Sequence, residues 1–336
     1  MAKLAVFIGL VVALLAGVAA FDWRVDPYGD LYKPAALTDA LKDDCLVSQE
    51  LVGARYFPFK LDVFHRRPTR TIVVGSSRVL KIAARPGERT FANVGYPGTT
   101  AESVQSLFDT LPAKPALTVY LGVEAFWFNR HYVSPNPEPS DYKIAQYLLS
   151  RVTFEGAYRY VREAPYILTH RWRRDRVGDR CVIGRQFPAI AWNTDGSRVW
   201  SWELDPARFG GLTPQRFENL ATWRSGYYDQ WNALDRDRLA AFDRALADAQ
   251  ARGWRVVGFA PPEPAASRRI LETDPRVAPR WHEFLRLMPV LFRGHGFTWA
   301  GLWNLDCPAR DFPDAFHTDA ACSARVRRAL DAAARR

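Results

Sequence analysis

Short apolar runs alternate with segments of helical periodicity along this chain of 336 residues. Apolar residues recur at helical spacing over 101–111 and over 239–249, and Gly253 is expected to end the second helix. Thr99 and Glu102 form a capping-box pattern before the first helix. The alternation predicts an α/β fold with a mainly parallel sheet and helices on both of its faces. The runs expected to form its strands are residues 71–74, 91–95, 117–123, 255–260 and 297–302.

Glycine, hydroxyl and carboxylate residues follow the predicted strands at the point where each strand ends. In an open parallel sheet, sites gather beyond the carboxyl ends of the strands. We therefore expect a functional site at this edge of the sheet. The residues that fall there are Gly75, Ser76, Ser77, Gly95, Glu124 and Pro261.

The chain is basic, with a net charge of +10, and its hydrophobic content of 48% is ample for a folded core. A basic chain favours an anionic partner such as a membrane surface or an acidic polymer. No spacing typical of RRM, KH or zinc-finger modules occurs, so we do not expect a nucleic-acid partner. No cluster of metal-ligating residues has ligand spacing, so no metal site is expected, and no cofactor is implied.

Leu4 to Phe21 is an uncharged apolar run of 18 residues, preceded by Lys3. As a helix it would be ~27 Å long, which is roughly the thickness of a bilayer core. It is either an uncleaved anchor or a signal peptide cut near the small residues Ala19 and Ala20. The run is longer than a typical signal core, which favours the anchor. We therefore expect a single-pass protein of the cytoplasmic membrane, with the rest of the chain outside the cytoplasm; the alternative is secretion after cleavage.

The composition divides the whole sequence into three parts. Residues 1–21 form the anchor, and residues 22–68 are interpreted as an irregular linker and lead-in rather than a separate domain. The main domain is expected over 69–336. A stretch at about 126–234, rich in Trp, Tyr and Arg, interrupts the alternation and is interpreted as a large insertion over the site.

Four cysteines lack any CxxC metal spacing: Cys45, Cys181, Cys307 and Cys322. In an exported protein, one or two disulfides are reasonable. A bond between Cys307 and Cys322 would close a loop around Asp314 and His317. Free buried thiols fit the sequence equally well.

Ser77 and the Asp314–His317 pair together supply a nucleophile, a base and an orienting acid. A serine hydroxyl needs a base to become nucleophilic, and the base needs a partner that holds its tautomer. Asp314 precedes His317 by three residues, within reach of its Nδ1. The backbone N–H groups of Ser77 and Gly95 could donate to an oxyanion. Each part has an ordinary structural explanation as well, since Asp314 could simply cap a helix.

The order of these motifs resembles the SGNH-hydrolase superfamily, in which a Gly-Asp-Ser block, an oxyanion glycine, a Gly-x-Asn-Asp block and an Asp-x-x-His block follow one another. The matching segments here are 75–77, 93–95, 121–124 and 314–317. Within the superfamily, the sequence is most similar to membrane-anchored envelope proteins related to alginate O-acetyltransferases and the teichoic-acid D-alanylation protein. The similarity lies in the apolar run, in Asp26-Pro27-Tyr28-Gly29 and in the Gly-Ser-Ser-Arg motif. The resemblance implies an SGNH-like three-layer αβα sandwich and a membrane-embedded protein that donates the acyl group.

The chain departs from the family pattern at two positions. Ser76 stands where the first block has Asp, and Glu124 stands where the third block has Asn. An ionised carboxylate cannot donate to an oxyanion, so the third donor is missing or comes from elsewhere, with Asn129 as a candidate.

Arginines and aromatic residues are dense in part of the insertion, with eight arginines against four acidic residues over 151–180. They indicate either a surface for an anionic glycan or lipid headgroup, or a solvated helical face. A group of tryptophans in the insertion would either stack on sugars or form its core: Trp192, Trp200, Trp202, Trp223 and Trp231. The candidate substrate-binding residues are Arg78, Glu124, Arg171, Arg173 and Arg174.

From these residues and the resemblance, we expect an exported, membrane-tethered enzyme that transfers an O-acyl group, with acetyl as the expected group, to an envelope polysaccharide through an acyl-enzyme at Ser77. A carbohydrate or lipid esterase with the same residues is one alternative. A non-catalytic glycan-binding scaffold is the other.

Overall fold

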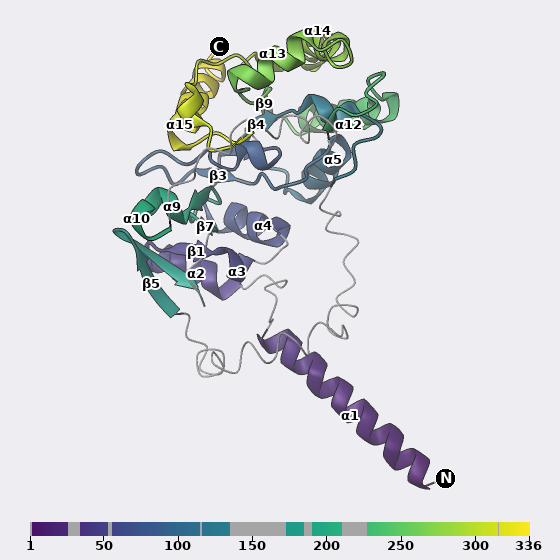
Figure 1. Cartoon of the computed structure of the whole chain (residues 1–336), viewed down its shortest axis with the longest axis vertical. Helices are drawn as coiled ribbons and strands as arrows, with labels where there is room; N and C mark the ends of the chain where they lie inside the picture. Colours follow the sequence, from purple (N-terminus) through teal and green to yellow (C-terminus); the bar gives the residue numbers. More distant parts are fainter. Residues whose placement is uncertain are drawn as a thin grey trace. The chain divides into compact units, whose positions relative to one another are not determined.

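The computed structural model describes residues 2–25, 34–52, 56–114, 116–134, 173–184, 190–209, 227–314 and 316–336 (Figure 1). The chain divides into two compact units. The first comprises Met1–Phe59, Glu138–Thr194 and Trp200–Phe209, and the second comprises Lys60–Pro137, Asp195–Val199 and Gly210–Arg336.

The chain begins with a long apolar helix, α1 (Ala2–Val25). Its segment Ala2–Ala20 has a mean hydropathy of 2.4, and none of it is buried within the protein. A helix of this length and composition can cross a membrane, and a signal sequence would have the same features. The expected N-terminal apolar helix is therefore confirmed.

One five-stranded sheet has the order β5-β6-β1-β7-β8, and its strands β5, β6, β1 and β7 belong to the first unit. Strand β1 pairs in parallel with β6 and antiparallel with β7, and the Cys45–Cys181 disulfide joins the start of β1 to β6. The described elements of this sheet and of the rest of the first unit are α2 (Pro34–Asp43), β1 (Leu46–Ser48), α3 (Gln49–Val52), β5 (Arg173–Val177), β6 (Arg180–Gly184), β7 (Ile190–Trp192), β8 (Arg198–Trp200), α9 (Ser201–Leu204) and α10 (Pro206–Phe209).

The described residues differ from the sequence interpretation in two places. Residues 22–68 are not an irregular lead-in, because their described part contains α2, β1, α3 and α4 (Tyr56–Arg66). Residues 173–192 are likewise more than an insertion into the main domain, since their strands build one sheet with β1. Strand β1 has only three residues, too few to show a period, and its partner cysteine lies 136 residues away.

The second unit contains the predicted mainly parallel sheet, with the order β10-β9-β4-β2-β3. Every described pairing in it is parallel, which confirms the sheet. Each strand lies within a predicted run, and four of the runs are trimmed by one to three residues. The strands are β2 (Thr71–Val74), β3 (Phe91–Asn93), β4 (Thr118–Gly122), β9 (Arg255–Phe259) and β10 (Thr298–Ala300).

Helices pack on both faces of this sheet. On one face, Val257 of β9 packs with Val326 and Leu330 of the C-terminal helix. The next residue, Gly258, points to the opposite face, where a Cβ would lie 2.2 Å from the ring of Phe292. The helices are α5 (Ala101–Thr110), α12 (Arg236–Ala251), α13 (Ala265–Thr273), α14 (Ala278–Gly294) and α15 (Ala320–Ala333).

Helix α5 begins one residue later than the sequence predicts. Thr100 caps it, and Ser103 rather than Glu102 completes the capping box. Thr99 instead donates its hydroxyl to the carbonyl oxygens of Gly75 and Tyr96. The side chain expected at the helix cap therefore holds the turn after β2.

Substituting Gly258 by alanine should destabilise the second unit, because the new methyl group would overlap the buried ring of Phe292. We expect Gly258→Ala to lower the free energy of unfolding by about 1–3 kcal/mol, as overpacking usually does. Gly294→Ala is the matched control, since nothing lies within 4 Å of its Cβ position. Urea titration of both variants measures the difference, and equal midpoints would contradict the packing described.

Candidate active site

A sharp turn carries Ser77 at the carboxyl end of β2. Gly75 has a φ of +149°, and a Cβ there would lie 2.9 Å from the carbonyl oxygen of Gly122. Ser76 caps the short helix η1 (Ser77–Val79) by accepting a hydrogen bond from the Arg78 amide at 3.2 Å. Ser77 is therefore the first residue of η1, and it is partly exposed.

Ser77, His317 and Asp314 form one hydrogen-bonded chain. The Ser77 Oγ lies 2.8 Å from the Nε2 of His317, a residue 240 positions further along. The Nδ1 of His317 lies 2.7 Å from the Asp314 Oδ2. The other carboxylate oxygen, Oδ1, accepts from the amides of Phe316 and His317, at 2.7 Å each. Asp314 thus fixes the backbone at Phe316 and His317 with one carboxylate oxygen and orients the His317 ring with the other.

The charge states of Ser77, His317 and Asp314 suit proton transfer from the serine. Burial raises the pKa of Asp314, but the hydrogen bond and charge of His317 and the two backbone amides outweigh burial and bring that pKa to about 2. Burial lowers the pKa of His317 below its ordinary 6.5, the hydrogen bond that His317 donates to Asp314 opposes this shift, and the positive charges of Arg198 and Arg78 lower the pKa further. At neutral pH the imidazole is therefore neutral, with one nitrogen able to accept the serine proton.

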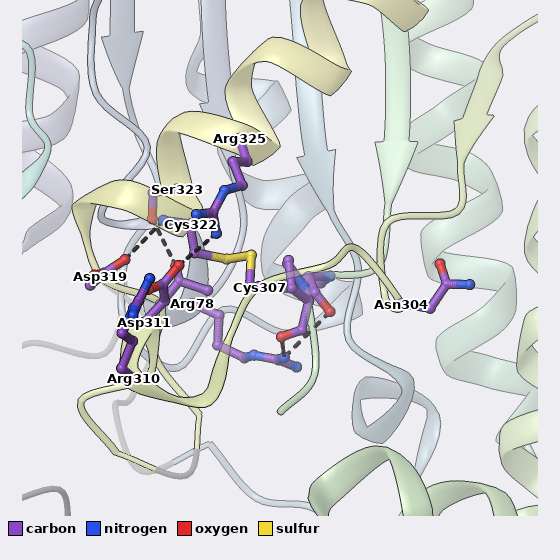
Figure 2. The surroundings of a disulfide bond; sticks show 12 residues. Arg78, Asn304, Cys307, Arg310, Asp311, Asp319, Cys322, Ser323 and Arg325 are labelled. Atoms are coloured by element: carbon purple, nitrogen blue, oxygen red, sulfur yellow. Dashed lines mark hydrogen bonds and ion pairs between the residues drawn. A yellow bond between two sulfur atoms is a disulfide. The ribbon is translucent and has the colours of Figure 1, made fainter. Parts of the chain in front are cut away.

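A disulfide between Cys307 and Cys322 closes the loop that carries Asp314 and His317, which is one of the two alternatives that the sequence left open (Figure 2). Within the loop, Asp311 accepts from Arg325 at 2.6 Å, and the Asp319 carboxylate caps α15. The loop that presents His317 is therefore held to the start of α15 by a covalent bond and an ion pair.

The structure gives two expected oxyanion donors other partners. The Gly95 amide donates to the Asn93 Oδ1 at 3.0 Å. The side-chain Nδ2 of Asn129 donates to the carbonyl oxygens of Tyr227 and Asp229, at 3.1 and 2.9 Å. Asn129 thus holds the 227–229 segment instead of facing an oxyanion. The Ser77 amide is the first of η1, a position where the helix itself supplies no backbone acceptor.

Arg78 and Glu124, expected to bind substrate, are buried in an ion pair at 2.8 Å, with only 4% and 2% of their side chains exposed. Glu124 also accepts from the Ser76 hydroxyl at 2.6 Å. Glu263, which the sequence analysis missed, accepts from Arg78 at 2.6 Å. Its position just after β9, like that of Glu124 after β4, was the available signal. The side chains of Arg78, Glu124 and Glu263 are thus bonded to one another within the protein.

The other candidate arginines belong to the first unit or lie outside the described residues. Arg171 lies outside the described residues, and Arg173 begins β5 in the first unit. Arg174 forms an ion pair with Asp43, also in the first unit. Two of the tryptophans considered as sugar platforms, Trp192 and Trp231, are buried core residues instead.

Partly exposed aromatic side chains lie beside His317, a feature that the sequence did not indicate. The ring centroids of Tyr227 and Phe316 are 5.1 Å apart, and Tyr227 stacks on Tyr132 at 5.5 Å. Phe316 itself lies 6.3 Å from the His317 ring. Tyr227 reaches this place because Asn129 binds its backbone, over about 100 residues of chain.

No protein-family model matches the chain, and the curated proteins include no significant match. Within the described ranges, no three His, Cys, Asp or Glu side chains gather as a metal site. The arrangement of Ser77, His317 and Asp314 is therefore the basis for any functional inference.

Removing the Cys307–Cys322 disulfide should loosen the His317 loop. We expect a double Cys→Ser variant to lose about 3 kcal/mol of stability, the loss typical for a loop of this length. Amide exchange over residues 308–321 should also become faster, because the Asp314 bonds to the Phe316 and His317 amides would form less often.

The Cys45→Ser, Cys181→Ser pair is the matched control, since that disulfide lies in the first unit. Hydrogen exchange read by mass spectrometry should show no acceleration over 308–321 in this control. Equal protection of that segment in both double variants would contradict the role given to the Cys307–Cys322 bond.

Proposed function

We propose that the protein is an exported SGNH-like serine O-acyltransferase that acts on an envelope polysaccharide through an acyl-enzyme at Ser77. The observation that carries the proposal is the hydrogen-bonded chain from the Ser77 Oγ through His317 to Asp314, with bonds of 2.8 and 2.7 Å. A neutral imidazole held between a serine and an ionised carboxylate is the arrangement that makes serine nucleophilic.

In the first half of the proposed reaction, the Ser77 Oγ attacks the carbonyl carbon of an acyl donor and its proton passes to the His317 Nε2. The tetrahedral intermediate then breaks its bond to the leaving group, which takes the proton from His317. Asp314 keeps the Nδ1 protonated and stabilises the imidazolium while it exists.

In the second half, a sugar hydroxyl gives its proton to His317 and attacks the acyl-enzyme. The bond between the acyl group and the Ser77 Oγ breaks, and the proton returns from His317 to serine. The acyl group ends as an ester on the glycan, and no cofactor enters either half.

The state of the oxyanion donors supports transfer from an activated donor over hydrolysis of ordinary esters. The Gly95 amide and the Asn129 side chain are bonded within the protein, which leaves the Ser77 amide as the oxyanion donor. One such donor is worth about 3–4 kcal/mol of transition-state stabilisation. An activated acyl group requires less of this stabilisation.

The proposed place of action is the outer side of the cytoplasmic membrane. The apolar helix α1 is long enough to anchor the chain there, and two disulfides indicate an oxidising compartment. The net charge of +10 favours an anionic envelope polymer as acceptor. The acyl donor proposed is a membrane-embedded protein, as in the envelope proteins that the chain resembles.

Ser77 should react with a serine-directed fluorophosphonate, because His317 activates its hydroxyl. We expect labelling of the wild-type protein and loss of labelling in both Ser77→Ala and His317→Ala. Ser106→Ala, at an exposed position on α5, is the control and should label like wild type. Equal labelling of Ser77→Ala and wild type, read by peptide mass spectrometry, would disprove the proposal.

Transfer and hydrolysis compete for the same acyl-enzyme, so their ratio separates the leading function from an esterase. With a model acyl ester and an added glycan, a transferase should form acylated glycan faster than free acid. Release of free acid alone at every glycan concentration would favour the esterase.

The acyl-transfer rate should depend on pH through His317, which must be neutral to accept the serine proton. Its pKa lies below 6.5, so kcat/KM should be constant at neutral pH and fall about tenfold per unit at pH values below that pKa. Rates with a model ester, alongside circular dichroism at each pH, measure this limb. A limb centred above pH 6.5 would contradict the environment described for His317.

A further inference from the structure

Arg78 uses its whole guanidinium inside the protein. A guanidinium has five N–H donors, and the hydrogen bonds of Arg78 are equal to them in number. The Nη1 donates to Glu124 and to Glu263, at 2.8 and 2.6 Å. The Nη2 donates to the carbonyl oxygens of Pro262, at 2.6 Å, and Pro261, at 3.4 Å. The Nε donates to the carbonyl oxygen of Phe316 at 3.3 Å.

These acceptors come from three separate segments of the second unit. Glu124 follows β4, the Pro261–Glu263 segment follows β9, and Phe316 lies in the loop closed by the Cys307–Cys322 disulfide, where Figure 2 places Arg78 beside it. Arg78 itself follows Ser77 directly. The bond from Arg78 to the Phe316 carbonyl oxygen therefore joins the residue after Ser77 to the residue before His317.

The bond to Phe316 matters most for geometry. Phe316 precedes His317, so its carbonyl oxygen belongs to the peptide unit whose nitrogen is the His317 amide. The Asp314 Oδ1 holds the N–H of that same peptide unit at 2.7 Å. One peptide plane is thus fixed at its oxygen by Arg78 and at its nitrogen by Asp314, and this plane sets where the imidazole lies relative to the Ser77 Oγ.

The carboxylates keep the guanidinium in place against the cost of burial. A buried arginine without partners would be strongly destabilising, and two carboxylates with nearly buried side chains compensate it. Both Glu124 oxygens have partners, whereas the Glu263 Oε2 is buried without a hydrogen bond. Burial raises the pKa of Glu263 to about 7, helped by the charge of Glu124 and opposed by Arg78. A proton held by Glu263 brings the charge of the three groups toward neutrality.

We propose that Arg78 is a positioning residue, which sets the distance between His317 and Ser77 by binding the Phe316 carbonyl oxygen while Glu124 and Glu263 anchor its guanidinium. The inference rests on the proposed function only for its kinetic consequence. Arg78 is buried and does not touch a substrate, so it acts on the rate of serine attack and not on substrate affinity.

Arg78→Lys is the decisive variant, because lysine keeps the charge but lacks the planar fork needed to reach all three segments. In the full-length protein in detergent, we expect the fluorophosphonate labelling rate of Ser77 to fall 10- to 100-fold, the range for a misplacement of about 1 Å. With a model ester, kcat for acyl transfer should fall and KM should stay unchanged. The low-field proton resonance of the His317–Asp314 hydrogen bond should shift or broaden.

Arg327→Lys is the matched control. Arg327 is also a buried arginine, with 6% of its side chain exposed, and it bonds to Glu88, Asp331 and the Ala83 carbonyl oxygen. Its substitution should lower the unfolding temperature but leave the labelling rate of the folded protein and the low-field resonance unchanged. A merely structural effect of losing a buried arginine would instead be the same in both variants.

The resonance separates failure of this inference from failure of the proposed function. A wild-type protein that has the resonance but never labels at Ser77 would overturn the function, while a changed resonance in Arg78→Lys would still support the positioning role. A folded Arg78→Lys variant with wild-type resonance and labelling would overturn the inference. If Arg78→Lys does not fold, Glu124→Gln removes one support of the guanidinium, and an unchanged resonance in that variant would overturn it equally.

Discussion

One buried guanidinium determines how the described site is assembled. The side chain of Arg78 bonds to segments that follow β4 and β9 and to the loop of His317. Parallel strands end at the same edge of the sheet, so their following loops are neighbours, but nothing in a parallel sheet fixes the loops to one another. Arg78 supplies that connection, and its position directly after Ser77 makes the turn and the His317 loop parts of one rigid arrangement.

Two local features at the same edge of the sheet position the hydrogen-bonded residues Ser77, His317 and Asp314. Gly75 lets the backbone turn within one residue of β2, where a side chain would meet the carbonyl oxygen of Gly122. Across the edge, Asp314 uses one oxygen for the backbone and the other for the ring of His317. Burial lowers the pKa of His317, and burial also makes an unpaired Arg78 too costly, so the electrostatics and the packing of the site have a common cause.

Much of the second unit could be predicted from the sequence, because its strands are apolar runs bounded by glycine or proline and its helices have long apolar faces. Ser77 was expected at the carboxyl end of a strand, and its pairing with His317 was expected from the order of motifs in the superfamily that the sequence resembles. The sheet of the first unit could not be predicted, since β1 has three residues and pairs with strands more than 130 residues away. Nor could the sequence indicate that Gly95 and Asn129 donate to internal acceptors, because both bonds depend on tertiary contacts.

The two residues that depart from the pattern of the superfamily that the sequence resembles, Ser76 and Glu124, contact each other. A carboxylate is absent from the position of Ser76 and present at Glu124, and the two side chains are hydrogen-bonded at 2.6 Å. The short Ser76 side chain leaves room for Glu124 to reach both its hydroxyl and the guanidinium of Arg78. An aspartate at 76 would place a second negative charge against Glu124 in a buried setting, at a large electrostatic cost. Under the proposed function, the changes at Ser76 and Glu124 belong together. The site lacks one oxyanion donor, and in its place it has a rigid, charge-compensated support for the turn that carries Ser77.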